Sequence, residues 1–159
     1  MRSGRVLPAV SIAVAVLLTI VPMPEAAEPW RPYWVALVMI YWHLETDHLR
    51  TLGPAFAIGL VLDLVSGTLL GQHALSLVII NFLVARFRNR LRFFPPWQQA
   101  LAVGALLVND RIVRLWILAL LGRGWPDWNW WLPPVTGLLL WPFAFLLLDA
   151  VRLRWRSAQ

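Results

Sequence analysis

The longest apolar stretch of the chain runs from Leu52 to Val84 and reads LGPAFAIGLVLDLVSGTLLGQHALSLVIINFLV. A helix rising 1.5 Å per residue crosses about 30 Å of hydrocarbon in about 20 residues, so this stretch is longer than one crossing requires. Small and polar residues interrupt it near its middle, namely Ser66, Gly67, Gly71, Gln72 and His73. The pattern predicts two membrane-spanning helices joined by a tight turn. The alternative is a re-entrant loop, which would have to be buried in protein.

Further apolar runs lie on both sides of this predicted hairpin. The first run stops at Pro22, and the last begins near Pro133 and Pro134, which suit a first helical turn. Pro142 is predicted to kink the interior of the last helix. The second run is short, which implies local thinning of the bilayer or anchoring by aromatic residues. The sequence predicts six spans, at about residues 6–21, 30–44, 52–66, 71–86, 98–121 and 132–151.

The composition supports an integral membrane protein. Hydrophobic residues make up 60% of the chain, against about 45–50% in soluble domains. The polar segments between the apolar runs are far shorter than the roughly 50 residues that a soluble domain needs. We therefore expect an all-α integral membrane protein, in which residues 1–159 form one polytopic transmembrane domain. Cysteine is absent, which excludes disulfides and thiolate metal sites.

The arginines predict the orientation of the spans. The net charge of +6 comes from 14 basic residues, all of them arginine, and they flank apolar runs, so we expect them to face anionic lipid headgroups rather than nucleic acid. Arg31 and Arg123 lie on one predicted side. The other side carries far more and is therefore predicted to be cytoplasmic, with both termini inside. Its arginines are Arg2, Arg5, Arg50, Arg86, Arg88, Arg90, Arg92, Arg152, Arg154 and Arg156.

The N-terminus has a second interpretation. Arg2 and Arg5 precede an apolar run, and Glu25-Ala26-Ala27 follows it, as in a secretory signal with a cleavage site. Cleavage would leave five spans, and the loop from Arg86 to Arg92 would still be cytoplasmic.

Four ionisable residues fall inside predicted spans: Asp63, Asp110, Arg111 and Arg114. Asp110 and Arg114 are four residues apart, so they are predicted to form an ion pair within one helix. Asp63 lies about 18 Å along its helix, close to the depth of the two arginines. This similarity predicts a contact from Asp63 to Arg111 or Arg114 across a helix interface. A proton or ion pathway is the functional alternative.

Small residues and histidines carry weaker signals. Gly67-x3-Gly71 and Ala100-x3-Gly104 predict surfaces where helices or turns approach closely, so Ser66, Gly67 and Gly71 join the charged residues as interface candidates. The histidines lack metal-binding spacing and are interpreted as ordinary interfacial residues, with His43 and His48 in the cytoplasmic loop and His73 in the outer turn. Common catalytic and nucleotide-binding motifs are missing, so we expect no enzyme, no cofactor and no metal site.

Eleven tryptophans indicate an aromatic belt at the membrane interfaces. A cluster in the predicted outer loop is alternatively a docking surface for the membrane-proximal segment of a partner. The candidates for contact with a partner or with lipid are therefore Trp125, Trp128, Trp130 and Trp131 outside, and Arg86, Arg88, Arg90 and Arg92 inside.

Several short motifs together resemble the MreD family of rod shape-determining membrane proteins. They are Arg31-Pro32-Tyr33-Trp34, Gly59-x3-Asp63-x2-Ser66-Gly67-x3-Gly71, Trp97-Gln98-Gln99 and Gly137-x3-Trp141-Pro142. The resemblance covers nearly the whole chain, and only Arg111 with Arg114 departs from it. It implies a multi-pass subunit of the bacterial inner membrane whose six helices are similar to the substrate-binding subunits (S-components) of energy-coupling-factor transporters.

The resemblance also implies partners. Members of the family bind MreC, and with it link the cytoplasmic MreB filament to the peptidoglycan synthases RodA and penicillin-binding protein 2. We therefore expect a non-catalytic scaffold of the elongation machinery. Membrane lipids are expected as further contacts and nucleic acid is not, and the formation of a homo-oligomer is left open. The alternative is a small-molecule-binding subunit of a membrane transporter, which the six spans and the buried charges would equally suit.

Overall fold

The computed structural model describes residues 3–46 and 52–157, and every regular element within these ranges is a helix. This confirms the all-α prediction. The helices are α1 (Ser3–Ile20), α2 (Trp34–Glu45), α3 (Leu52–Ser66), α4 (Gln72–Leu91), α5 (Pro96–Leu120) and α6 (Leu132–Ser157), with two short 3₁₀ helices, η1 (Glu28–Trp30) and η3 (Trp128–Trp131). Arg2, His48 and Arg50 lie outside the described residues.

The helix positions follow the predicted apolar runs, but two helices extend beyond them. The segment from Arg86 to Arg92 was predicted to be a loop, and most of it belongs to the last turns of α4, which ends at Leu91. The arginines at 152–156 likewise continue α6 to Ser157. Arginine has a high helix propensity, and its charge favours the C-terminal turn of a helix. In α4 and α6, the helix therefore continues past the end of its apolar run.

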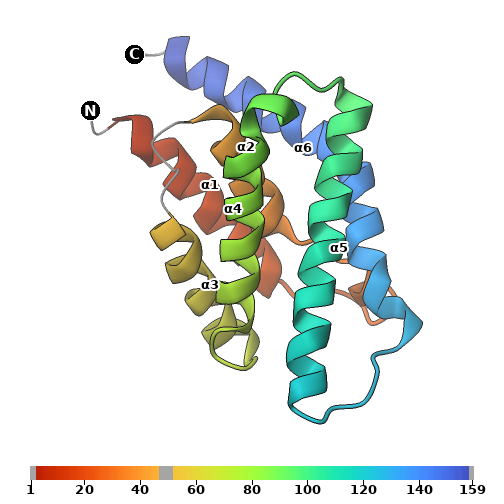
Figure 1. Cartoon of the computed structure of the whole chain (residues 1–159). Helices are drawn as coiled ribbons and strands as arrows, with labels where there is room; N and C mark the ends of the chain where they lie inside the picture. Colours follow the sequence, from red (N-terminus) through yellow and green to blue (C-terminus); the bar gives the residue numbers. More distant parts are fainter. Residues whose placement is uncertain (1–2, 47–51, 158–159) are drawn as a thin grey trace.

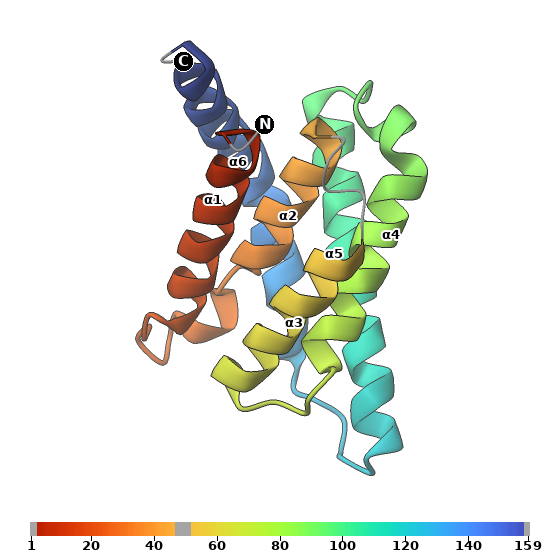
Figure 2. The same cartoon turned by 90° about the vertical axis from the view of Figure 1, so that its left-hand side faces the viewer.

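Successive helices run in alternating directions through the bundle (Figure 1). The start of α1, the end of α6 and the α4–α5 connection lie at one end, which we call the terminal end. The connections at residues 21–33, 67–71 and 121–131 lie at the other, which we call the turn end (Figures 1 and 2). The predicted tight turn between the two helices of the 52–84 stretch is therefore observed.

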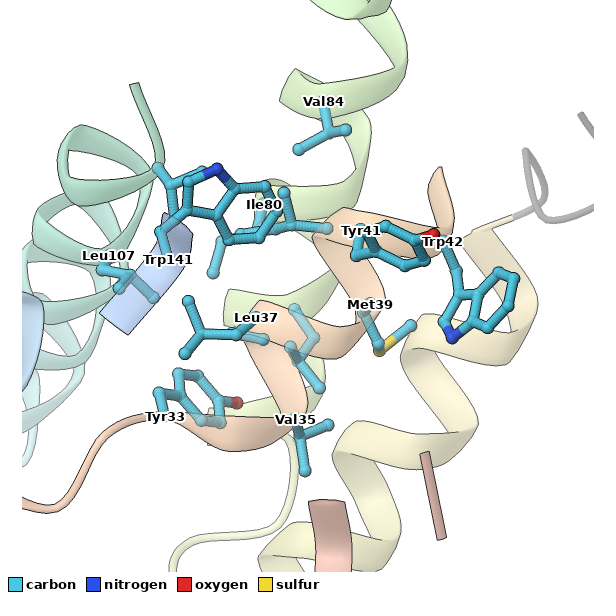
Figure 3. Packing of buried hydrophobic residues seen from close by; sticks show 14 of the residues in the cluster. Tyr33, Val35, Leu37, Met39, Tyr41, Trp42, Ile80, Val84, Leu107 and Trp141 are labelled. Atoms are coloured by element: carbon cyan, nitrogen blue, oxygen red, sulfur yellow. The ribbon is translucent and has the colours of Figure 1, made fainter. Parts of the chain in front are cut away.

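Helix α2 forms the centre of the bundle. Nearly all its residues from Val35 to Leu44 are buried, and it packs against α1, α4 and α6. Its side chains belong to one buried cluster with Ile80 and Val84 of α4, Leu107 of α5 and Trp141 of α6 (Figure 3). A helix that is apolar around its whole circumference is suited to such a buried position. Burial among the other helices thus suits this short second run.

The outer surface of the bundle is apolar. Exposed fractions reach 60% at Leu17, 73% at Leu64 and 71% at Phe143, on α1, α3 and α6. Within the described residues, one helical segment, Trp128–Ser157, is long and apolar enough to cross a membrane by itself, while Arg5–Ile20 and Leu52–Ser66 are apolar but shorter. Pro142 lies inside α6, which is one continuous helix.

Glycine sets the distance between α3 and α4. A Cβ atom at Gly59 would lie 2.2 Å from the Cα of Ala74, so only glycine permits this approach. A Cβ atom at Gly104 would lie 2.7 Å from Cδ1 of Leu138, a side-chain atom, where α5 packs on α6. This close contact agrees with the predicted role of the Ala100-x3-Gly104 pattern.

The other predicted glycine pair has a different role. A Cβ atom at Gly67 or Gly71 would meet nothing within 4 Å, but both residues have positive φ angles, of 62° and 100°. Glycine adopts this left-handed conformation without steric cost. These two glycines therefore shape the α3–α4 turn, and the prediction that they form a close-packing surface is wrong.

Helix α1 is tied to the rest of the bundle by polar contacts as well as by packing. The indole nitrogen of Trp42 donates to Ser11 Oγ at 2.7 Å, and the Arg31 guanidinium donates to the carbonyls of Thr19 and Val21 at 2.6 and 2.7 Å. Arg31 thus binds carbonyls that a helix C-terminus leaves free.

Candidate functional site

The turn end of the bundle contains a cluster of buried polar side chains that begins with Asp63. This residue lies in the last turn of α3 and is 1% exposed. Its carboxylate accepts hydrogen bonds from the backbone nitrogens of Gly71 and His73, at 2.7 and 2.8 Å, and from Thr68 Oγ1 at 2.9 Å. The ring nitrogen Nδ1 of His73 lies 2.8 Å from the same carboxylate. The first backbone N–H groups of α4 have no partner within the helix, so an acid satisfies them well.

Asp110 of α5 forms the second half of the cluster. Its Oδ1 accepts hydrogen bonds from Ser76 Oγ of α4 and from Arg114 Nε, the latter at 3.1 Å. All three residues are buried, and the Arg114 guanidinium lies 4.8 Å above the ring of Tyr33. The predicted intrahelical pair of Asp110 and Arg114 is therefore present, and Ser76 connects it to α4.

The structure does not contain the predicted contact from Asp63 to Arg111 or Arg114. Asp63 is satisfied by the α3–α4 turn and by His73, and the buried arginine pairs with Asp110 instead. The depth estimate placed these residues at a similar level, and His73 does line the same pocket as both arginines. Depth along the helix does not take into account the backbone donors that the α3–α4 turn supplies next to Asp63.

Two histidines are more deeply placed than predicted. His73 was interpreted as an interfacial residue, but it is buried beside Asp63 in the first turn of α4. His43 was assigned to a loop, but it is 2% exposed inside α2, where its Nδ1 lies 3.0 Å from the carbonyl oxygen of Met39. Among the described residues, no group of three or more His, Asp or Glu side chains is placed to hold a metal ion.

A pocket of about 530 Å³ opens beside this cluster. Its walls come from η1, the start of α4, the outer part of α5 and the 126–133 segment. Arg111, which is half-buried, lies in this pocket with its guanidinium 4.7 Å above the Trp130 ring. Arg114 and Tyr33 form its inner wall.

A second polar cluster, at the terminal end, was missed by the sequence analysis. Arg152 of α6 contacts Glu45 at the end of α2 and lies 2.7 Å from Asp149. Tyr41 donates a hydrogen bond of 3.2 Å to Asp149, and Arg88 Nε donates to the Leu44 carbonyl at 2.9 Å. The spacing of Asp149 and Arg152 on one helix face was the only available signal.

The residues predicted to contact a partner or lipid differ in their exposure. Trp125 and Trp128 are 86% and 81% exposed, whereas Trp130 and Trp131 are half-buried. Arg86, Arg90 and Arg92 are exposed, and Arg88 is buried. Ser66 and Gly67 are exposed.

An apolar groove of about 490 Å³ runs between α1 and α6 over the surface of α2. Val10 and Val14 of α1 form one wall, and Phe143 and Leu147 of α6 form the other. Ala144 lies along the groove and leaves it open because its side chain is small.

An all-α bundle with an apolar exterior and paired charges inside is typical of helical membrane proteins. The family model described as rod shape-determining protein MreD matches residues 2–151. The rod shape-determining protein MreD of Haemophilus influenzae is 31% identical over 139 residues, which cover 87% of this chain and 86% of that protein. The chain belongs to the MreD family, which implies a role in rod shape determination. No solved structure matches it.

Proposed function

We propose that this chain is a non-catalytic membrane subunit of the bacterial cell-elongation machinery. It binds MreC, and with it links MreB filaments to the peptidoglycan synthases RodA and penicillin-binding protein 2. The observation that carries this proposal is the family match over residues 2–151. An apolar exterior on an all-helical bundle supports a multi-pass location in the inner membrane.

The arrangement of arginines supports a topology with both termini in the cytoplasm. The terminal end carries Arg5 and the groups at 86–92 and 152–156, whereas Arg31 and Arg123 lie in the connections of the turn end. An excess of arginine marks the cytoplasmic side of a membrane protein. Exposed Arg86, Arg90 and Arg92 hold that face against anionic lipid or acidic partners.

Two neighbouring kinds of surface suit different parts of MreC. The groove between α1 and α6 has apolar walls on both sides, which suit one membrane-spanning helix of a partner. At the turn end, exposed Leu69 and Leu70 of the 66–73 turn, together with Trp125 and Trp128, offer apolar side chains to the membrane-proximal segment that follows. The role of the chain is then passive, because it positions MreC without chemistry of its own.

Filling the groove tests this proposal. In cells depleted of the native protein, which should become round, the Ala144→Trp variant should fail to restore rods and should no longer co-purify with MreC. Ala57→Trp is the matched control, because Ala57 is exposed on α3 away from the groove. Both variants must accumulate in membranes to equal levels. Rod-shaped cells after depletion, together with no co-purification of MreC with the native chain, would contradict the proposed function.

The second candidate function, a small-molecule-binding subunit, is favoured by one observation, the pocket of about 530 Å³ at the turn end. Ligand pockets in proteins usually measure about 300–1,000 Å³. Binding there would not require MreC, so the two functions can be tested separately.

A further inference from the structure

The turn-end pocket contains hydrogen-bond donors that the folded chain leaves without partners. Trp130 Nε1 and Arg31 Nε are buried without a hydrogen-bond partner in the protein. Tyr33 Oη is buried beside Arg114, which can only donate to it, so the Tyr33 hydroxyl proton has no acceptor. All three residues line the pocket. Buried polar groups in folded proteins almost always have partners. Three such donors in residues that line one pocket suit an occupant that supplies acceptor oxygens.

The charges around the pocket indicate the sign of that occupant. Arg31 forms an ion pair with Glu28 at 3.0 Å, and Arg114 forms one with Asp110. Arg111 contacts the Trp130 ring and forms no ion pair with any described acidic residue.

Arg111 and Arg114 also lie three residues apart on one helix, where like charges repel. Asp127, the remaining acidic residue of the wall, is exposed. The guanidinium of Arg111 is thus available to an external anion.

The shape of the walls adds a third constraint. Pro29, Pro32, Pro126 and Pro133 line the pocket together with Tyr33 and Trp130. The volume of about 530 Å³ exceeds what a small inorganic anion fills. A guanidinium fork matches the paired oxygens of a carboxylate or a phosphodiester. The apolar walls suit the organic part of such a molecule.

We propose that the turn-end pocket binds an organic anion with a single negative charge and two acceptor oxygens, held by Arg111 with Tyr33 and Trp130. A water-soluble carboxylate and a phosphodiester headgroup of an anionic lipid share this chemistry. The site is separate from the groove between α1 and α6, and its 126–130 wall adjoins Trp125 and Trp128 of the surface proposed for MreC. Binding of the anion is therefore measured on the purified chain without MreC.

Thermal unfolding of the full chain, purified in a neutral detergent, tests the proposal with two pairs of probes. Phenylacetate is compared with phenylacetamide, which has the same shape without the charge. Dioctanoyl phosphatidylglycerol is compared with dioctanoyl phosphatidylcholine. A ligand that binds the folded state raises the Tm with its concentration and saturates. We expect saturable stabilisation by at least one anion and none by its uncharged or zwitterionic counterpart.

Variants locate the binding. Arg111→Gln should weaken the apparent affinity at least tenfold, which corresponds to about 1.4 kcal/mol. Arg111→Lys keeps the charge without the fork and should give an intermediate loss, and Tyr33→Phe should weaken binding without changing any charge. Arg123→Gln is the control, because Arg123 is an exposed arginine of the turn end outside the pocket, and it should change the affinity less than about twofold.

The outcomes separate the sources of the anion. Stabilisation by phenylacetate alone identifies a soluble carboxylate, and stabilisation by phosphatidylglycerol alone identifies a lipid headgroup. The proposal is overturned if neither anion gives a saturable shift up to about 10 mM, a concentration that would detect even weak binding. It is also overturned if Arg111→Gln and Arg123→Gln have equal effects, or if the uncharged and zwitterionic probes stabilise as well as the anions.

Discussion

The carboxylate of Asp63 and the ring of His73 meet across the α3–α4 turn, with Oδ1 2.8 Å from Nδ1. The same oxygen lies 2.8 Å from the backbone nitrogen of His73, and Oδ2 accepts the backbone N–H of Gly71. One buried side chain thus joins the last turn of α3 to the first turn of α4. The exposed turn of the proposed MreC surface is therefore held in place from inside the bundle.

Replacing Asp63 should weaken the whole bundle. In Asp63→Asn, an amide N–H₂ would face backbone and side-chain donors, and the charge that strengthens these hydrogen bonds would be lost. We expect the free energy of unfolding to fall by about 2 kcal/mol or more, measured by thermal or detergent-induced unfolding. Asp127→Asn, at an exposed site of the turn end, should change it by less than about 0.5 kcal/mol. Equal effects of the two variants would show that the network contributes little.

A methyl group at Gly59 should separate α3 from α4. Its Cβ would lie 2.2 Å from the Ala74 Cα, and because backbone cannot move aside like a side chain, Gly59→Ala should destabilise the protein by about 3 kcal/mol. Gly53→Ala is the matched control on the same helix, since nothing lies within 4 Å of its Cβ position. That variant should be neutral or slightly stabilising. A stable Gly59→Ala protein would exclude the close approach described here.

Asp110 and Arg114 should be strongly coupled. Removing one partner by Asp110→Asn or Arg114→Met leaves the other charge buried and unpaired, which costs about 3–5 kcal/mol. The double variant removes both charges and should be less destabilised than the sum of the single variants by at least about 1 kcal/mol. Unfolding of all four proteins in detergent measures the coupling. Additive losses would mean that the pair is not a unit.

The absence of cysteine makes the proposed topology directly measurable. Single cysteines at Asn89→Cys in α4 and Asp127→Cys in the turn end are both exposed. A maleimide that does not cross membranes should label position 127 in intact cells with a permeabilised outer membrane, and position 89 only after the inner membrane is opened. The reverse pattern would invert the orientation.

Local composition predicted the helices well, because the apolar runs and their prolines directly reflect helix-forming segments. The Asp110–Arg114 pair was also predictable, since four-residue spacing places two side chains on one helix face. The roles of Gly67 and Gly71 were not, because a spacing of small residues does not distinguish tight packing from positive φ angles. Glu45 and Arg152 are 107 residues apart, so only the three-dimensional fold brings them together.

Partners of buried polar residues were the least predictable part of the site. Asp63 was matched with arginines by depth along the helix, but depth does not give the direction in which a side chain points. In the structure, the Asp63 carboxylate accepts hydrogen bonds from the backbone nitrogens of Gly71 and His73, which follow it in the sequence by only eight and ten residues. The pocket likewise depends on Tyr33, Arg111 and Trp130 from three separate segments, and no sequence motif connects them.

The enclosed position of α2 has a consequence for biogenesis. Its 12 residues extend about 18 Å, too little to cross a bilayer unaided, and α4 and α6, which complete its surroundings, are translated later. In the proposed membrane location, we therefore expect the insertion of α2 to be completed only after these later helices are made. Its final placement waits for the C-terminal half of the chain, so truncation before α6 should leave the N-terminal half exposed to membrane proteases.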